Sequence, residues 1–571
     1  MKKNTQLILL ISAIILLCPF FTPAQKVILS REEKMKQHHE VPDMPYLPNA
    51  FNNQKTSPAQ SFRSSDFFTI QVNVNANGQN IVGDAANEPS IAVDPLNPNN
   101  IVIGWRQFDN VGSNFRQAGL SFSHNAGLTW TDPGVILEPG IFRSDPVLDY
   151  DTTGKFYYNS LTFDGLNYTC KVFKSLDGGA DWNAGVEAHG GDKQWMTIDH
   201  TNGIGSGNIY ATWNNQFTSC PTGNFTRSTD GGASFENCIL VAGQPFWGTL
   251  TVGNNEELYI TGVGNPEGAV VAKSSNAYLG PGSEITWDFI SQVDLDGYIE
   301  GNSNINPVGI LGQAYIDVDR STGPGRDNVY VLASVQRILS GDPGDVMFAK
   351  STDGGLTWGF PIKVNDDVST TNTQWFGTMS VAPNGRIDAV WLDTREDQTG
   401  SDLSALYYSY SMDQGDTWSV NEKISPAFNP HVGYPQQDKM GDYFDMISGN
   451  SGAHLAWANT LNGEEDVYYS FINPLVTGTA NITKQDNYSS VSCYPNPCRE
   501  MTTIRYQLAA EGAVKLTVYN VYGQLIITLV DKHQAAGIYS INFSAVELPA
   551  GYYICKLTDG TNTATTRLVR M

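Results

Sequence analysis

One octapeptide pattern recurs along the chain and constrains its fold more than any other feature. The pattern reads Ser-x-Asp-x-Gly-x-x-Trp, and its copies begin at Ser123, Ser175, Ser228, Ser351 and Ser411. These starts lie 52, 53, 123 and 60 residues apart, so the longest gap equals two periods. A degenerate copy is therefore expected from Ser275 to Trp287. Spacing of this kind indicates an array of similar supersecondary units, as in propellers and solenoids.

A second motif, a strand, a tight turn and a strand, recurs with the same spacing. Its first example is Pro89–Asp94 followed by Ile101–Trp105, and the other turns fall at Asp151, Asp199, Gly253, Asp319, Ala382 and Ser448. Each of these seven units holds about four short alternating runs, the content of one propeller blade. Because a blade cannot bury both of its faces alone, blades stack in a ring. The sequence predicts an all-β, seven-bladed β-propeller over residues 67–474, with six blades as the alternative.

The octapeptides are interpreted as structural turns, called boxes below. Ser and Asp side chains accept hydrogen bonds from nearby backbone N–H groups, Gly adopts turn conformations, and Trp packs back on the blade. The residues expected to act in this way are Ser123, Asn125, Trp130, Asp177, Trp182, Asp230, Asp353, Trp358, Asp413 and Trp418.

These repeats resemble the Asp-box (BNR) repeats of sialidases and of related sialidase-like β-propellers. The resemblance covers roughly Glu88 to Phe471, and the repeated motif is specific for the fold but much less so for activity. Sialidases have six blades, whereas seven strand–turn–strand units are present here.

The two ends of the repeat region suggest how the ring closes. The last unit, Tyr443 to Phe471, has only three alternating runs, and the alternating segment Phe67–Val74 precedes the first unit. Pairing of these segments would complete the last blade and leave no open strand edge.

The N-terminus has the pattern of an export signal. Two lysines precede an apolar run from Leu7 to Leu17, which is too short to span a bilayer. Small residues at Thr22 and Ala24 predict signal-peptide cleavage after residue 24, with a flexible leader over 25–66. A lipoprotein is less consistent with the sequence because Leu17, not a small residue, precedes Cys18.

Six cysteines remain after cleavage, and Cys220 and Cys238 bracket a predicted hairpin across which they could face each other.

Composition excludes some classes of partner. Lys and Arg number 34 against 58 Asp and Glu, a net charge of −24 that disfavours nucleic acid. No later segment is long and apolar enough to span a membrane, and no Cys–His pattern, G-x-S-x-G or H-E-x-x-H supports a zinc site, serine hydrolase or zinc protease. No cofactor is expected, although the acidic loop Asn365-Asp366-Asp367 offers oxygen ligands suited to Ca²⁺.

A separate module follows the repeats. Residues 475–492 are polar and are interpreted as a linker, and residues 493–571 alternate strands with Gly turns, typical of a small Ig-like β-sandwich. The motifs Tyr494–Pro497, Val518–Gly523 and Leu548–Tyr553 resemble the type A C-terminal sorting domain of the type IX secretion system. This resemblance implies contact with that machinery and release or attachment at the cell surface. An ordinary adhesive Ig-like domain is the alternative.

Propeller topology sorts side chains onto two faces. The boxes and the turns between first and second strands share one face, and the starts of first strands and the ends of second strands share the other. The first-strand starts carry Glu88, Asp145, Asp192 and Asp442, and the second-strand ends carry Arg106, Arg337, Arg395, Asp393, Trp213 and Trp457. These side chains are expected to converge on a central funnel suited to sugars, whose rings pack on aromatics and whose hydroxyls or carboxylates bind charged groups.

Two functions follow from this funnel. A hydrolase of sialidase type needs an Arg cluster, a Tyr nucleophile and an acid, for which the candidates are Arg106, Arg143 and Arg395, then Tyr443, Glu88 and Asp145. Trp195, Trp247 and Trp375 are the candidate sugar-stacking residues, although core packing is an equally good interpretation of each. The Arg-Ile-Pro motif of sialidases is absent, and Phe142-Arg-Ser-Asp-Pro146 is its nearest equivalent. The chain is thus expected to be a secreted or cell-surface propeller that acts on or binds glycans, or else a non-catalytic binding or adhesion propeller for glycan or protein partners.

Overall fold

The computed structural model describes most of the repeat region and of the C-terminal module. The described residues are 33, 44–46, 55–64, 66–215, 218–265, 268–338, 340–474, 490–494, 498–499, 501–508, 511–520, 523–535, 537–560 and 563–570. The predicted signal peptide, most of the predicted leader and residues 475–489 of the predicted linker lie outside this set. Within it, no helix has the length and hydropathy needed to cross a membrane.

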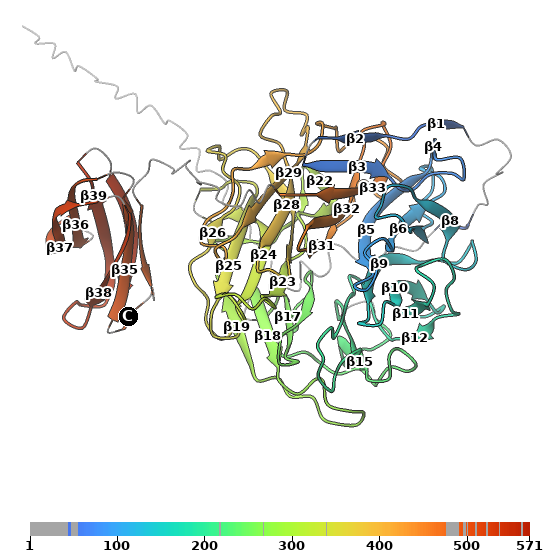
Figure 1. Cartoon of the computed structure of the whole chain (residues 1–571), viewed down its shortest axis with the longest axis horizontal. Helices are drawn as coiled ribbons and strands as arrows, with labels where there is room; N and C mark the ends of the chain where they lie inside the picture. The colour runs from blue at the N-terminus through green and yellow to red at the C-terminus, as the bar shows by residue number, and fades with distance from the viewer. Residues whose placement is uncertain are drawn as a thin grey trace, which may run out of the picture.

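Antiparallel sheets of three to five strands follow one another along residues 61–472 (Figure 1). The first two comprise β5 (Ala85–Val93), β6 (Ile101–Phe108), β7 (Gln117–Ser123) and β8 (Thr131–Val135), then β9 (Ser144–Tyr150), β10 (Phe156–Phe163), β11 (Tyr168–Ser175) and β12 (Val186–Glu187). The third and fourth comprise β13 (Trp195–Ile198), β14 (Ile209–Thr212) and β15 (Phe225–Ser228), then β16 (Leu250–Val252), β17 (Leu258–Val263), β18 (Ala269–Ser274) and β19 (Phe289–Val293).

Three further sheets complete the series in the described residues. The fifth holds β23 (Tyr315–Val318), β24 (Val329–Arg337), β25 (Asp345–Ser351) and β26 (Ile362–Lys363), with β20 (Gly297–Tyr298) on β24. The sixth holds β27 (Gln374–Val381), β28 (Ile387–Asp393), β29 (Ala405–Ser411) and β30 (Glu422–Lys423). The seventh holds β31 (Asp445–Gly449), β32 (Gly452–Asn459), β33 (Asp466–Ile472), β3 (Phe67–Gln71) and β2 (Ser61–Arg63). Two small ribbons pair β1 (Thr56–Pro58) with β4 (Gln79–Ile81) and β21 (Gly301–Ser303) with β22 (Asn306–Ile310).

The first strands of these sheets form a closed ring. Each contacts the first strand of the next sheet, and β31 of the last sheet contacts β5 of the first. Six of the junctions between neighbouring first strands contain the same type of hydrogen bond. In each, a Ser, Thr or Asp side chain accepts from a backbone N–H of the neighbouring first strand. The acceptor–donor pairs are Asp445–Ile91, Ser90–Leu148, Asp149–Ile198, Thr249–Ile316, Asp317–Val381 and Ser380–Ser448. The predicted all-β propeller fold is confirmed.

The axis of the ring is filled by side chains. Buried Trp195, Tyr315 and Tyr443 come from three different sheets, and their rings meet edge to face with centroids 5.1 and 5.9 Å from Trp195. Burial falls from the axis outward. All nine residues of β5 are buried, whereas the outermost strands β8 and β30 are largely exposed.

The N-terminal strand closes the ring as predicted. β3 pairs with β33 from Phe67 opposite Ile472 to Gln71 opposite Tyr468, and the hydroxyls of Thr69 and Ser470 lie 2.7 Å apart. The third and fourth strands of the seventh sheet therefore come from opposite ends of the repeat region. No chain segment joins them directly, which explains why this unit has no box.

The boxes form hydrogen-bonded turns at the ends of third strands. In the copy at Ser351, the Ser hydroxyl donates to Asp353 Oδ1 (2.8 Å) and accepts from Gly355 N (2.9 Å). Asp353 Oδ1 also accepts from the backbone N of Thr357 (2.9 Å). The same three bonds recur in the other four copies.

The degenerate copy begins one residue earlier than predicted. Ser274, the last residue of β18, donates to Asn276 Oδ1 at 3.1 Å, and Asn276 Oδ1 accepts from the backbone N of Thr286. Ser275 instead donates its hydroxyl to Asp288. The predicted start at Ser275 was therefore wrong, because the buried serine at the strand end takes the box position.

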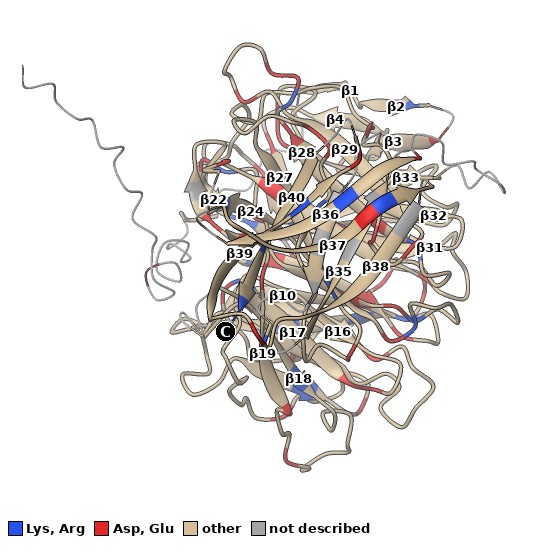
Figure 2. Cartoon of the chain, turned by 90° about the vertical axis from the view of Figure 1, so that its left-hand side faces the viewer, with Lys and Arg blue, Asp and Glu red and all other residues tan. Residues whose placement is uncertain are grey.

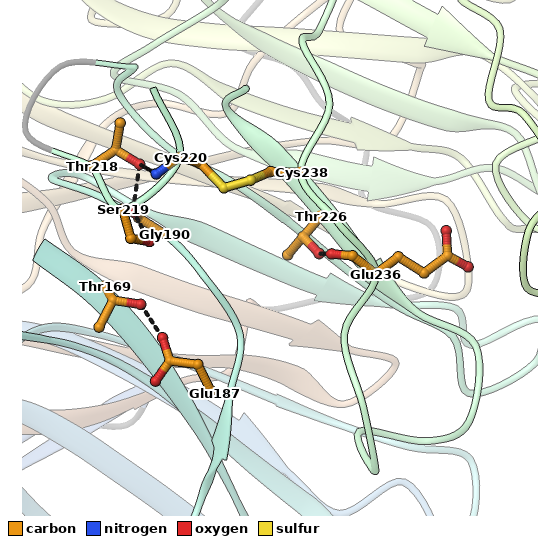
Figure 3. Close-up of a disulfide and its surroundings, with 9 residues drawn as sticks. All are labelled: Thr169, Glu187, Gly190, Thr218, Ser219, Cys220, Thr226, Glu236 and Cys238. Carbon is orange, nitrogen blue, oxygen red and sulfur yellow. Dashed lines mark hydrogen bonds between the residues drawn. A yellow bond between two sulfur atoms is a disulfide. The ribbon is translucent and has the colours of Figure 1, made fainter. Parts of the chain in front are cut away.

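A disulfide joins Cys220 to Cys238, which confirms the pairing considered from the sequence (Figure 3). Their Cα atoms lie 6.3 Å apart, and the backbone N of Cys220 donates to Thr218 Oγ1. His189 lies close enough to both sulfurs to form, with them, a possible metal-binding group, but the disulfide occupies both thiols.

The C-terminal module is a two-sheet β-sandwich. One sheet contains β34 (Ser490–Tyr494), β35 (Met501–Leu508) and β38 (Gly537–Ser544), and the other contains β37 (Leu525–Gln534), β36 (Gly512–Asn520), β39 (Gly551–Thr558) and β40 (Thr563–Arg570). Its core includes Ile504, Leu516, Cys555 and Leu568, all fully buried.

Candidate functional site

The starts of the first strands share an unusual backbone conformation. A left-handed residue occurs at this position in each sheet of the ring, although only glycine adopts such φ values readily. The residues, with φ, are Glu88 (50°), Asp145 (47°), Lys193 (57°), Trp247 (55°), Gly312 (130°), Phe376 (55°) and Gly441 (92°). Register shifts in the pairing of β5 and β27 mark the corresponding bulges. Strained non-glycine residues persist only where the surroundings hold them, and such residues often lie at functional sites.

Glu88, at one of these starts, forms the first part of an ion-pair chain with two cations. Glu88 Oε1 lies 3.3 Å from Arg106 Nη2 and 3.1 Å from Lys439 Nζ. Arg106 lies opposite Asn87 in the β5–β6 register and donates from Nε to its Oδ1 at 2.8 Å. All of these side chains are buried, so their attraction is only weakly screened by solvent.

The chain continues through Asp442. Its Oδ2 lies 2.5 Å from Lys439 Nζ and 2.7 Å from Lys193 Nζ, and Lys193 Nζ lies 3.5 Å from Asp192 Oδ1. Positive and negative groups therefore alternate from Asp192 to Arg106, drawn from the third, seventh and first sheets. Asp145 of the second sheet joins by accepting from the backbone N of Lys193 at 3.1 Å.

Burial and neighbouring charge drive the carboxyl pKa values apart. Burial raises the pKa of Glu88 to about 7 against the attraction of Arg106 and Lys439, and it raises that of Asp192 to about 6. For Asp145, burial is outweighed by Lys193 and Arg106, which lower its pKa to about 2. Glu88 is thus mostly neutral below pH 7. Asp145, which is also 0 % exposed, stays ionised.

The β21–β22 hairpin covers this cluster. The backbone N of Ile310 donates to Asp442 Oδ1 at 3.0 Å, and Asn306 Nδ2 donates to the carbonyl of Gly441 at 2.9 Å. Asn306 Oδ1 also accepts from the backbone N of Met440. The hairpin lies between β20 and β23 of the fifth sheet, so these contacts join the fifth unit to the segment that precedes β31 of the seventh sheet.

The structure brings together some of the predicted site residues. Glu88, Arg106 and Asp145 meet in the cluster, with Asp192 and Asp442 from the predicted first-strand starts. Tyr443 lies beside them, but its hydroxyl donates to the carbonyl of Pro146 at 2.8 Å, and its ring packs on Trp195.

Other predicted residues lie apart from the cluster. Arg143 packs over the ring of Phe173, and Arg395 pairs with Asp393 and Asp366 in the sixth sheet. The three arginines proposed for a sugar carboxylate therefore do not meet. Trp195, Trp247 and Trp375 are at most 6 % exposed and belong to the core, so their faces are not open to a sugar.

Two cations of the cluster were missed by the sequence interpretation. Lys193 directly follows Asp192, and Lys439 lies three residues before Asp442. A basic residue beside a predicted first-strand start is the signal that could have identified both.

The loop considered for Ca²⁺ is occupied by protein contacts. Asp366 accepts from Arg395 and from the backbone N of Asn421 (3.1 Å), and Asp367 lies 3.7 Å from Lys363 Nζ. Asn365 donates from Nδ2 to neighbouring oxygens, including Asp345 Oδ1. Asp367 Oδ2, in contrast, is buried and accepts no hydrogen bond from the described residues.

A cavity of about 520 Å³ is lined in part by residues of the hairpin and its flanks. Hydroxyl, amide and carboxyl side chains predominate in its lining, which consists of Glu300, Gly301, Ser303, Asn304, Ile305, Leu311, Gln336, Pro343, Thr371, Thr373 and Asp402. A smaller cavity of about 320 Å³, lined in part by Arg227, Glu236 and Glu284, lies between the third and fourth sheets.

Comparison with solved structures gives only remote likenesses. A protein of unknown function from Dyadobacter fermentans is 13% identical with a TM-score of 0.41, over 72% of this chain and 98% of its own. A fungal alcohol oxidase in complex with copper is 11% identical (TM-score 0.45; 91% and 100% covered), and an α-L-arabinanase from Penicillium chrysogenum is 10% identical (TM-score 0.27; 73% and 98% covered). Values this low carry no argument about activity.

No curated protein matches the chain. Residues 492–570, however, match the family described as secretion system C-terminal sorting domain. This match confirms the resemblance seen in the motifs of the C-terminal module. The C-terminal module is therefore a type IX secretion sorting domain, and the protein is exported to the cell surface or beyond it.

Proposed function

We propose that this exported propeller binds a neutral glycan in the cavity beside the β21–β22 hairpin, without hydrolysing it. Hydroxyl and amide groups such as Ser303, Asn304, Gln336 and Thr371 line the cavity, and groups of this kind exchange hydrogen bonds with sugar hydroxyls. The cavity volume is within the range usual for small-ligand sites.

The observation that carries the proposal is that the candidate catalytic groups are already engaged in buried ion pairs. Glu88, Asp442 and their cations form a buried chain of ion pairs under the hairpin. A general acid or nucleophile must reach the glycosidic bond, and these groups reach one another instead.

Charge in the cavity argues against an acidic sugar. Its lining includes Glu300 and Asp402, and no Lys or Arg is among the described lining residues. A sialoside carboxylate would be repelled there. The hydrogen bonding of the boxes supports a relationship to sialidase-like Asp-box propellers in fold, with a different ligand.

The proposal extends to location and partners. The predicted signal-peptide cleavage after residue 24 and the sorting domain support a location outside the cell, where glycans or glycoproteins are available. Acidic residues recur in the loops around the propeller sheets, which is consistent with a soluble, non-nucleic-acid-binding surface (Figure 2).

A glycan array with the full chain tests the proposal. Neutral glycans are expected to bind, and Glu300→Gln and Gln336→Ala are expected to weaken binding about tenfold because each removes a polar contact. Glu284→Gln in the smaller cavity is the charge-matched control and should bind normally. Binding confined to sialosides, or equally weakened by the control, would contradict the proposal.

A glycoside hydrolase is the second candidate, supported by the separated pKa values of Glu88 (about 7) and Asp145 (about 2). Such a pair can provide an acid and an ionised partner at one pH. Turnover of fluorogenic glycosides, lost in both Glu88→Gln and Tyr443→Phe, would favour this candidate.

A further inference from the structure

Two buried cysteines of the sorting domain face each other between its sheets. Cys493 lies in β34 and pairs with Ile504 of β35, while Cys555 lies in β39 and pairs with Val518 of β36. Their sulfur atoms are 3.5 Å apart, and each residue is at most 1 % exposed. The pair therefore links the two sheets at the centre of the domain core.

We propose that Cys493 and Cys555 form an inter-sheet disulfide in the exported protein. Small rotations about the side-chain bonds bring sulfurs at this separation to bonding distance, because the two strands already place both side chains in the same layer. Exported proteins retain disulfides, and the Cys220–Cys238 bond occurs in the same chain. The bond would enclose most of the sorting domain, from β34 to β39.

The third buried cysteine of the domain, Cys498, is held in a different place. Its backbone N donates to the carbonyl of Val569 at 2.9 Å, and it forms a β-bridge with Arg570. The only sulfur–sulfur hydrogen bond among the described cysteines joins Cys493 to Cys555, with Cys493 as donor. This contact lowers the pKa of the Cys555 thiol in the folded domain.

The oxidation is a thiol–disulfide exchange with a disulfide-containing oxidant, before the sandwich closes. The Cys555 thiolate attacks one sulfur of the oxidant, forming a mixed disulfide and releasing one thiol. The Cys493 thiolate then attacks the Cys555 sulfur, which forms the Cys493–Cys555 bond and releases the second thiol. Two protein thiols are oxidised, one disulfide is reduced, and both protons end on the released thiols.

Mass spectrometry of the full chain tests the proposal directly. The protein is produced by export, purified without reductant, and alkylated under denaturing conditions, using a preparation in which Cys220–Cys238 is linked. Trypsin places Cys493 and Cys498 together in peptide 485–499 and Cys555 in peptide 533–556. Fragmentation before Pro495 or Pro497 then separates Cys493 from Cys498.

The expected result is peptide 485–499 linked to 533–556 through Cys493, with Cys498 alkylated. Alkylation of both Cys493 and Cys555, or a link through Cys498, would overturn the proposal. Thermal unfolding gives a second readout. Reductant should lower the Tm of the sandwich by about 10 °C or more in the wild type and in Cys498→Ala, but not in the Cys493→Ala/Cys555→Ala double variant. An equal shift in that double variant would also overturn it.

Discussion

Two halves of the propeller ring use the same backbone for different chemistry. At the starts of the first strands, the seventh, first, second and third sheets contribute Asp442, Glu88, Asp145 and Lys193 to one ion-paired cluster. At the equivalent left-handed positions, the fourth and sixth sheets carry Trp247 and Phe376, which are buried in apolar cores.

The comparison separates what the fold requires from what the chain adds. Every sheet needs a left-handed residue here, and the requirement is met by Gly in the fifth and seventh sheets and by strained residues elsewhere. The charges are not needed for that geometry, since aromatic residues satisfy it equally well. Stability in the charged half should therefore depend on ion pairing and pH, and stability in the apolar half on packing.

The largest expected effect comes from breaking the ion-pair chain at its middle. Lys439→Met removes the cation between Glu88 and Asp442 and should lower the free energy of unfolding by about 3–5 kcal/mol, because two buried carboxylates lose a partner. Lys423→Met, which breaks a half-exposed pair with Glu396, is the control and should cost at most about 1 kcal/mol. Chemical denaturation measures both, and equal effects would contradict a structural role for the cluster.

The next effect concerns the contact between Gly441 and Glu88. A Cβ at Gly441 would lie 2.7 Å from Glu88 Cγ, so Gly441→Ala should cost about 2–4 kcal/mol through strain and steric overlap. Gly463 has nearly the same φ, 91° against 92°, with open space around it. Gly463→Ala should thus show the backbone contribution alone, about 1–2 kcal/mol in denaturation experiments. Similar losses for both variants would exclude close packing at Glu88.

The pH dependence of stability should change when Glu88 is neutralised. Its folded-state pKa of about 7 lies above the ordinary value of 4.5, so the stability it contributes is present below pH 4.5 and is lost as the pH rises to about 7. Glu88→Gln should reduce this slope by up to about 1.4 kcal/mol per pH unit. The pKa values of Asp445 and Asp466 are also raised to about 7. Because these two groups are present in the variant, part of the pH dependence remains. An unchanged profile, measured by denaturation between pH 5 and 8, would contradict this assignment.

The smallest expected effect comes from substitutions in the boxes, and it should be the same in the charged and the apolar half of the ring. Asp230 in the third sheet and Asp413 in the sixth make matching box hydrogen bonds. Asp230→Ala and Asp413→Ala should each lower the free energy of unfolding by about 1–2 kcal/mol. A difference above about 1 kcal/mol between them would show that the boxes are not equivalent.

Much of the fold was predictable because it follows from patterns of residues that are close in the sequence. The box spacing, the strand–turn–strand units and the closing segment Phe67–Val74, of which Phe67–Gln71 forms β3, depend on residues close in sequence or on the need to pair an open edge. Topology also predicted that Glu88, Arg106 and Asp442 lie at the same end of their strands, and the three side chains do meet in one cluster.

The rest of the site depended on contacts between distant segments. The hairpin at 301–310 reaches Asp442, 132 residues from Ile310, and no local pattern indicates that contact. Arg143 and Arg395 lie on the expected strands or loops, but Arg143 packs on Phe173 and Arg395 pairs with Asp366, each from a separate segment. The partner of each side chain depends on such separate segments, and alternation along a strand does not reveal it.

The most direct test of the structural role of the cluster is a double-mutant cycle between Glu88 and Lys439, measured by chemical denaturation of the full chain. Glu88→Gln, Lys439→Met and the double variant should give a coupling energy of about 1.5 kcal/mol or more, because the ion pair at 3.1 Å is removed in each single variant. Additive effects within about 0.5 kcal/mol would show that the buried charges do not stabilise one another, and would contradict the account.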